Sequence, residues 1–261
     1  YLAELLPETF RTVHMAEQLL KRLNFALMIL VEANYPLMGA LVDTAIAKNI
    51  SVIQTIQPAR DDAMIFKKLN SATRRIHPAS VSPESMERLA HVEWTDEQEK
   101  RLEQEFKNRY GGAWFLQSRN QPGVKRKSRE EIMKQLHLDP SKKIAVVFSP
   151  VLWDANLFYG EDLFEDYGDW FVQTVRAACA NPHVNWIIKM HPANLWKRAR
   201  EKVESEFSEV MLINKEIGAL PPHVKLLYPN TDISTWSLFE LTDYGITVRG
   251  TIGMELTCLG K

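Results

Sequence analysis

Apolar runs and amphipathic stretches alternate along the chain. The runs that predict strands occupy residues 25–31, 50–56, 143–148, 184–190, 224–227 and 244–248. The run at 25–31 is almost continuously apolar, which is typical of a strand that is buried on both faces of a parallel sheet. Helical patterns separate the runs, so the sequence predicts strand–helix–strand units and an α/β fold.

Helices are expected where apolar residues recur at helical spacing or where start signals occur. The expected helices cover residues 8–21, 37–48, 59–69, 84–91, 95–110, 128–137, 162–180, 194–206, 234–241 and the stretch after Gly250. The helix at 128–137 opens with a capping-box pattern, Ser128 with Glu131. The helix at 95–110 is highly charged, so we expect it on the surface, packed through Leu102 and Phe106.

The best linker is the polar, basic and turn-rich segment at residues 117–127, whose basic side chains we expect to be solvated. It predicts a boundary between two domains, residues 1–116 and residues 128–261. The chain begins at Tyr1 without an initiator Met and stops directly after a helix. We therefore expect a fragment of a longer protein, in which the sheets are incomplete at both ends.

Composition excludes several classes of protein. The chain is 45% hydrophobic and 25% charged, with a net charge of −1, so no basic surface for nucleic acid is indicated. Cys179 and Cys258 stand in apolar helical contexts and predict buried thiols in a reducing compartment. No apolar run reaches the roughly 18 residues of a membrane span, and no signal peptide is visible. A cytoplasmic protein is expected.

A Gly-Thr turn near the end of the chain is the first candidate site. A glycine at Gly250 or Gly253 lets the backbone approach a ligand closely, and the first amides of the following helix can bind an anion. Thr251 would cap this helix or donate its hydroxyl to a phosphate. Glu255 would accept hydrogen bonds from sugar hydroxyls. The alternative is a plain strand–turn–helix joint, capped by Thr251, with Glu255 solvated.

A second candidate site follows the strand at 184–190. Lys189, His191 and Pro192 stand at its carboxyl end, where ligands bind in open parallel sheets. They and the Gly-Thr turn would converge on one phosphate-bearing ligand. The alternative is that His191 is a turn residue without chemistry. Ser149, after the strand at 143–148, is either a ligand contact or a turn residue that bonds its own backbone.

Two segments carry a resemblance to a known family. The segments IIKMHP, residues 187–192, and TDISTWSLFELTDYGITVRGTIGMELTCLGK, residues 231–261, resemble the capsular polysaccharide biosynthesis glycosyltransferases. These are GT-B enzymes related to bacterial Kdo transferases, and the resemblance runs from about residue 27 to residue 261. It implies a GT-B-like α/β fold of two Rossmann-like domains with parallel sheets, the N-terminal one incomplete and on the acceptor side.

The resemblance also implies an activity and its site. The protein would be an inverting glycosyltransferase that moves a sugar from a nucleotide-sugar donor, with CMP-Kdo as one candidate, to a capsular or surface polysaccharide. The C-terminal domain would bind the donor. Its implied donor-binding residues are Ser149, Lys189, His191, Pro192, Gly250, Thr251, Gly253 and Glu255.

Glu32 and His191 are the candidate catalytic residues. Glu32 follows the strand at 25–31, and a carboxylate there would act as general base on an acceptor hydroxyl. The alternatives are that Glu32 caps the next helix or pairs with a lysine, and that the base lies upstream of Tyr1. A cationic His191 would stabilise the leaving phosphate. No Asp-x-Asp motif occurs, so we expect neither a metal nor another cofactor.

Three other functions stay open. They are a teichoic-acid-type polyol-phosphate transferase that uses a CDP-polyol, a non-catalytic capsule-assembly protein, and a nucleotide epimerase of the same two-domain type. The expected partners are a nucleotide-sugar donor, a glycan or glycolipid acceptor and a capsule-export complex, but no nucleic acid. The place of action would be the cytoplasm or the inner face of the cytoplasmic membrane.

Overall fold

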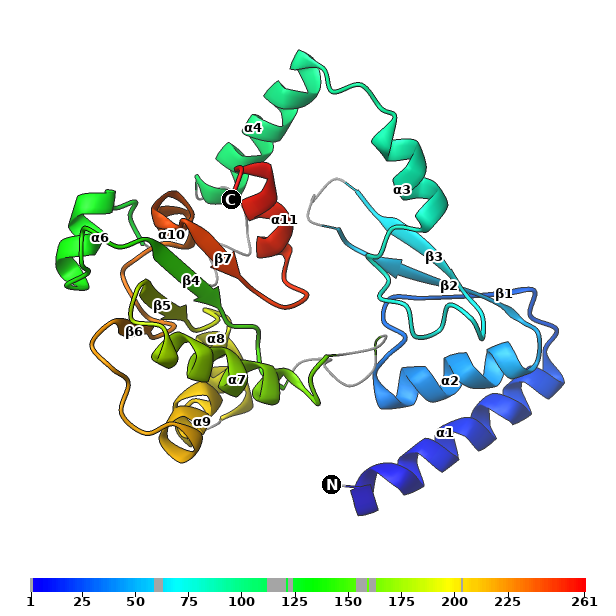
Figure 1. Ribbon diagram of the computed structural model, residues 1–261. Helices are drawn as coiled ribbons and strands as arrows, with labels where there is room; N and C mark the ends of the chain where they lie inside the picture. The colour runs from blue at the N-terminus through cyan, green and yellow to red at the C-terminus, as the bar shows by residue number, and fades with distance from the viewer. Residues whose placement is uncertain are drawn as a thin grey trace. The chain divides into compact units, whose positions relative to one another are not determined.

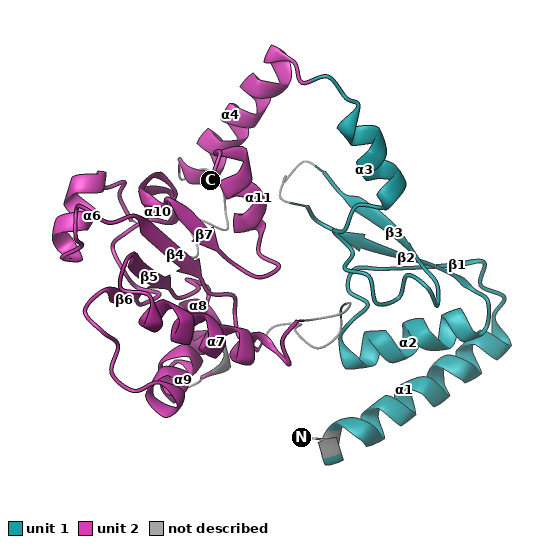
Figure 2. Ribbon diagram, viewed as in Figure 1, with its two compact units in different colours: residues 1–93, 157–161 teal, residues 94–156, 162–261 magenta. Residues whose placement is uncertain are grey.

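The computed structural model describes residues 2–58, 63–111, 121, 124–153, 159, 163–202 and 204–261. The chain forms two compact units (Figure 2). The first unit comprises Tyr1–Glu93 with Leu157–Glu161, and the second comprises Trp94–Asn156 with Asp162–Lys261. The expected linker at residues 117–127, part of which lies outside the described residues, therefore falls within the second unit and not between the two.

Among its described residues, the first unit holds a mixed sheet of order β1-β2-β3. Its strands are β1 (Leu27–Leu30), β2 (Ser51–Ile56) and β3 (Ile65–Leu69), and its helices are α1 (Leu2–Arg22), α2 (Pro36–Ala47) and α3 (Pro83–Ala90). The pair β1 and β2 is parallel, whereas β3 runs antiparallel to β2. The core lies between the sheet and the helices α1 and α2 (Figure 1), and it includes Leu30, Val42 and Val52.

Two expectations for the first unit are wrong. The strand at 25–31 was expected to be buried on both faces, but Ile29 is 60% exposed and Leu27 and Val31 are exposed with it. The reason is that the helices pack against the Leu30 face alone. In the range 59–69, where a helix was expected, residues 65–69 form the strand β3, because pairing with β2 outweighs the local pattern. Residues 59–62 lie outside the described residues.

The described part of the second unit holds a sheet of order β6-β5-β4-β7 whose neighbouring strands all run parallel (Figure 1). Its strands are β4 (Ile144–Phe148), β5 (Asn185–Lys189), β6 (Val224–Leu227) and β7 (Tyr244–Ile246). Counted from β4, the order is 3-2-1-4, which is that of the first four strands of a Rossmann fold. An α/β, Rossmann-like fold is thus confirmed for this unit.

Helices cover both faces of this sheet. They are α4 (Asp96–Tyr110), α6 (Arg129–Gln135), α7 (Tyr167–Ala180), α8 (Asn194–Glu201), α9 (Ser208–Glu216), α10 (Thr235–Leu241) and α11 (Thr251–Cys258). Every residue of β4 is buried, as the apolar run predicted. Val146 packs in one core with residues of α6, α10 and α11, and Val147 packs in another with residues of α7 and α9.

Several helix predictions need correction. The helix expected at 194–206 ends at Glu201, where Lys202 takes a left-handed conformation with φ 54°. The helix α9 was not predicted. Cys258, expected to be buried, is exposed, because it lies on the last turn of α11, away from the side that packs Leu256.

The helix α4 is anchored more firmly than its charge suggested. The ring of Phe106 lies 5.8 Å from that of Trp236, so the prediction that Phe106 packs inward is correct. Tyr110 adds a second anchor, with its ring 5.1 Å from Trp236 and 5.5 Å from Phe239. These contacts hold the end of α4 against the core beneath α10. They explain why the second unit begins before α4 and not at residue 128.

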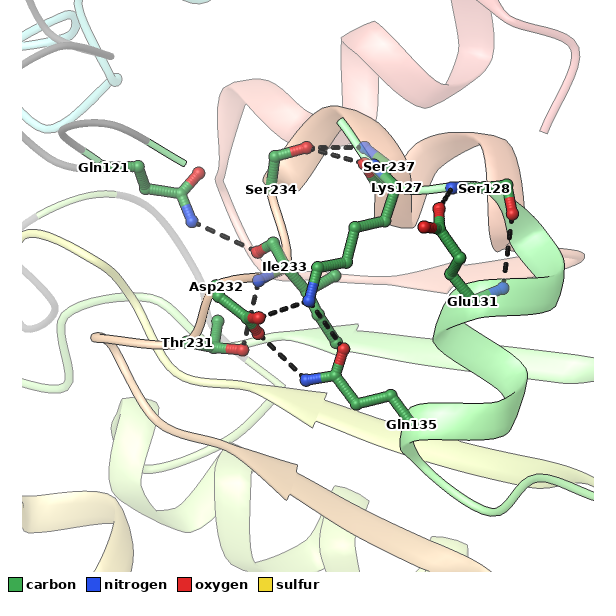
Figure 3. A network of polar contacts seen from close by, with 10 residues as sticks. All are labelled: Gln121, Lys127, Ser128, Glu131, Gln135, Thr231, Asp232, Ile233, Ser234 and Ser237. Atoms are coloured by element: carbon green, nitrogen blue, oxygen red, sulfur yellow. Dashed lines mark hydrogen bonds and ion pairs between the residues drawn. The ribbon is translucent and has the colours of Figure 1, made fainter. Parts of the chain in front are cut away.

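In the basic segment before α6, Lys125 and Arg126 are exposed, as expected, whereas Lys127 is held in a network of polar contacts (Figure 3). Lys127 Nζ donates to Asp232 and, at 2.7 Å, to Gln135 Oε1. Gln135 Nε2 donates in turn to Asp232 Oδ1 at 2.9 Å. The capping box of Ser128 and Glu131 is confirmed. These polar contacts tie the start of α6 to the turn that leads into α10.

In the ranges that the structure describes, no helix combines the length and the apolar character that a membrane crossing requires.

Candidate functional site

A small cleft of about 110 Å³ opens at the carboxyl ends of β4 and β5 and the amino end of α11. This position lies where the strand order of the second unit reverses, between β4 and β7, which is where ligands bind in open α/β sheets. Its lining comes from six separate stretches of the chain. The lining residues are Arg109, Tyr110, Gln121, Phe148, Ser149, Lys189, Met190, His191, Pro192, Thr235, Thr251, Ile252 and Glu255.

Most of the candidate binding residues meet in this cleft. Ser149, Lys189, His191, Pro192, Thr251 and Glu255 all line it. Gly250 is the N-cap of α11, and Gly253 lies in the first turn of that helix, where its N–H bonds the Gly250 carbonyl. The Lys-x-His-Pro segment and the Gly-Thr turn therefore face one space. The remaining candidate, Glu32, belongs to the first unit.

Lys189 is a buried cation beneath this cleft. Its residue is 2% exposed, and its Nζ donates to the carbonyl of Met190 at 2.9 Å. Burial lowers the pKa of Lys189 to about 8, against the opposing attraction of the Glu209 carboxylate. Lys189 is thus mostly charged at pH 7 and loses its charge in mildly alkaline solution.

Glu209 is a functional candidate that the sequence did not indicate. It is 1% exposed and accepts a hydrogen bond from Asn194 Nδ2 at 3.0 Å, and Ser149 Oγ lies 3.4 Å from its Oε1. Burial raises the pKa of its carboxyl group above the ordinary value. Glu209 comes from the first turn of α9, where an acid is common on any helix, so its sequence context carried no signal.

Ser149 and His191 make the local contacts that their turn alternatives predicted. Ser149 Oγ donates to the carbonyl of Pro150 at 3.0 Å. His191 Nδ1 accepts the N–H of Ala193 at 3.1 Å. In a neutral ring this bond leaves the proton on Nε2, so the second nitrogen is a donor. His191 can therefore have both roles. Its Nδ1 accepts the hydrogen bond of the turn, and the residue also lines the cleft.

The structure does not agree with the alternative in which Thr251 caps the helix and Glu255 is solvated. Gly250, not Thr251, is the N-cap of α11, and no side chain caps the helix there. Glu255 is not solvated, because it is 8% exposed. Arg109 Nη2 lies 2.7 Å from Glu255 Oε1, and the Tyr110 hydroxyl donates to Glu255 Oε2. Burial and then the Glu255 charge raise the pKa of Tyr110.

The cleft combines an anion site with a hydroxyl acceptor. Lys189 and Arg109 supply positive charge, and Thr251 and Ile252 supply N–H groups at the start of α11, where a helix leaves its first amides without internal partners. Glu255 supplies a carboxylate. A ligand that carries both a phosphate and vicinal hydroxyls satisfies both groups, and a nucleotide has this chemistry.

No family model matches the chain, and no curated protein matches it. A solved structure of MnaA from S. aureus with UDP aligns with 95% of this chain and 60% of its own, at 14% sequence identity and a TM-score of 0.33. The chain thus spans less than two thirds of the length of that protein. A TM-score of this size does not establish a common fold.

Proposed function

We propose that the protein is a glycosyltransferase of GT-B type whose second unit binds a nucleotide-sugar donor. The observation that carries the proposal is the meeting of Lys189 and His191 with Thr251 and Glu255 in one cleft of a Rossmann-like unit. These residues come from the two segments that resemble the capsular polysaccharide glycosyltransferases. The acceptor in this proposal is a growing surface glycan, and the reaction takes place on the cytoplasmic side of the membrane.

In the proposed complex, each part of the donor has a partner. The phosphate nearest the sugar lies at the amino end of α11 and near Lys189 and His191, and Glu255 accepts from the ribose hydroxyls. Gly250 leaves the backbone accessible at the helix start. Charged and N–H groups placed around the phosphate stabilise the negative charge that grows there as the bond to the sugar breaks.

The proposed reaction is a direct displacement at the anomeric carbon. An acceptor hydroxyl attacks this carbon, a carboxylate takes its proton, and the nucleotide leaves with the electrons of the broken carbon–oxygen bond. Glu32 is the candidate base, since only Val31 separates it from the end of β1 in the first unit. Inversion at the anomeric carbon is the expected stereochemical result.

Calorimetric titration with CMP, UMP and GMP tests the donor site. We expect one of them to bind, and His191→Ala to weaken its binding at least about tenfold, which is roughly 1.4 kcal/mol. His183→Ala is the matched control, because His183 is an exposed histidine of the same unit that does not line the cleft. Absence of binding by all three nucleotides would contradict the donor site.

Turnover separates the proposed function from its alternatives. Release of nucleotide from a sugar donor with inverted product supports the glycosyltransferase. Transfer from CDP-glycerol would instead identify a polyol-phosphate transferase, and interconversion of donor sugars would identify an epimerase. Nucleotide binding without turnover of any of these donors would favour a non-catalytic capsule-assembly protein.

A further inference from the structure

Arg109 and Tyr110 occupy the place where the proposed nucleotide would reach Glu255. Both come from the last turn of α4 and line the cleft together with Lys189. The cleft measures about 110 Å³, whereas pockets for complete small ligands commonly measure roughly 300–1,000 Å³. Ribose hydroxyls can therefore bond Glu255 only after one of its present partners has moved.

Of the two partners of Glu255, the arginine has the more flexible side chain. The ring of Tyr110 lies between Trp236 at 5.1 Å and Phe239 at 5.5 Å, and these contacts fix it in the core. The guanidinium of Arg109 ends a flexible side chain and lies 2.7 Å from Glu255. Tyr110 can thus continue to orient Glu255 while Arg109 changes its partner.

We propose that Arg109 exchanges partners, pairing with Glu255 in the nucleotide-free protein and with the phosphate of the nucleotide when it is bound. This inference rests on the proposed function and adds a phosphate ligand to it. The ribose hydroxyls then donate to Glu255 in place of the guanidinium. The side chains of Arg109 and Glu255 are only 13% and 9% exposed, so either charge would be costly if left alone.

A nucleotide offers both replacement partners at once. Its phosphate accepts two parallel hydrogen bonds from the guanidinium, which stays charged at any pH of interest. A nucleoside offers the hydroxyls but no phosphate, so its binding would take Glu255 from Arg109 without supplying another anion in its place. The exchange therefore makes the cleft selective for nucleotides over nucleosides of the same base, and the selectivity depends on the arginine.

Paired titrations test this exchange. Calorimetry compares CMP with cytidine, and UMP with uridine, on the wild-type protein and on Arg109→Gln. We expect Arg109→Gln to weaken monophosphate binding at least about tenfold, from the loss of a charge-assisted bond, and to leave nucleoside binding equal or stronger. Arg101→Gln is the matched control, because Arg101 is an exposed residue of the same helix outside the cleft.

A second variant shows whether a loss of binding comes from unfolding. The double variant Arg109→Gln with Glu255→Gln removes both charges and keeps the side-chain volumes, and thermal unfolding checks that it is folded. We expect it, too, to show a reduced ratio of monophosphate to nucleoside affinity. If the folded variants keep the wild-type ratio of monophosphate to nucleoside affinity, the exchange is wrong. An equal loss of affinity for the monophosphate and the nucleoside also overturns it, because it would show a structural role of Arg109.

The outcomes also distinguish this inference from the donor site itself. If wild-type protein binds a monophosphate and Arg109→Gln binds it equally well, the exchange is wrong and the donor site stands. If wild-type protein binds none of the nucleotides, the donor site is wrong and the exchange falls with it.

Discussion

At the scale of single residues, the candidate site of the second unit lies beside ionisable groups that the fold has buried. Lys189 and Glu209 are both almost fully covered, and burial displaces the pKa of each toward its neutral form. Groups buried in this way are costly to the fold and cluster at functional sites. They make the properties of the site sensitive to pH.

Nucleotide affinity should fall as the pH rises from 7 to 9. The pKa of Lys189 is about 8, so its charge is lost over this range, whereas Arg109 stays charged and the raised pKa of Tyr110 keeps its hydroxyl protonated. The nucleotide phosphate is already fully ionised there, since its second pKa is about 6. Calorimetry at three pH values measures the fall. Lys189→Met should bind more weakly at pH 7 and show little of this pH dependence.

The stability of the fold should also report on Lys189. Its pKa falls from about 10.5 in the unfolded chain to about 8 in the folded protein. Between these values the unfolded chain binds more protons, so the free energy of unfolding rises with pH across this window. Relative to Lys189→Met, we expect wild-type protein to gain most of roughly 3 kcal/mol from pH 8 to pH 10.5 in denaturant titrations. An equal pH profile for both proteins would contradict this burial.

Removal of Glu255 has a different consequence from the one expected for a solvated side chain. Glu255→Ala would leave Arg109 buried without its ion pair, and breaking such a pair costs about 3–5 kcal/mol. We expect Glu255→Gln, which keeps the shape, to lose less stability in thermal unfolding. Both variants should lose nucleotide affinity. Equal stability of Glu255→Ala and wild-type protein would show that the ion pair is unimportant.

At the scale of elements, the amino end of α11 is positioned by close packing on β7. A Cβ atom at Gly245 would overlap Leu256 Cδ1, so a larger residue there would force the Leu256 side chain to move. Arg249 turns the chain between the two elements with a left-handed φ of 52°. The strand, the turn and the helix thus act as one support for the candidate phosphate site.

Gly245→Ala should therefore disturb both the fold and the site. Overpacking against Leu256, which is buried, is expected to cost about 1–3 kcal/mol in denaturant unfolding. Nucleotide binding should weaken as α11 moves away from β7. The double variant Gly245→Ala with Leu256→Ala tests the cause, because it should be more stable than the sum of the single effects predicts. Strict additivity would place the effect elsewhere.

At the scale of the whole molecule, each of the two units has its own core, and the described cleft lies within the second. Val52→Ala removes buried volume in the first unit, at a residue that is fully covered. We expect it to lower stability by roughly 2 kcal/mol and to leave nucleotide affinity unchanged. Ile187→Ala, the matched change in the second unit, should lower both. Loss of nucleotide affinity in Val52→Ala would contradict a site confined to the second unit.

Glu32, the proposed general base, belongs to the first unit. Glu32→Gln should reduce turnover about a hundredfold or more, because it removes a general base, and it should leave donor binding intact. Steady-state kinetics and calorimetry on the same protein give the two values. Full activity of this variant would remove Glu32 from the mechanism.

Local sequence patterns predicted the structural features that depend on residues close together in the chain. The buried run of β4, the capping box at Ser128 and the strand ends that carry Lys189 and Ser149 were all readable from a few adjacent residues. The parallel order of the second sheet places those strand ends at one edge. For this reason, most of the binding residues that the sequence predicted line the cleft.

Residues that reach the cleft from distant helices were not readable. Arg109 and Tyr110 sit on a charged helix whose pattern indicates a surface position. Glu209, which lies beside Ser149 rather than in the cleft lining, sits on a helix that was not predicted. The exposure of one face of the first sheet could not be predicted either, because an apolar run does not reveal which face of a strand is covered. Packing between segments far apart in the chain decides both matters, and no local pattern of residues records that packing.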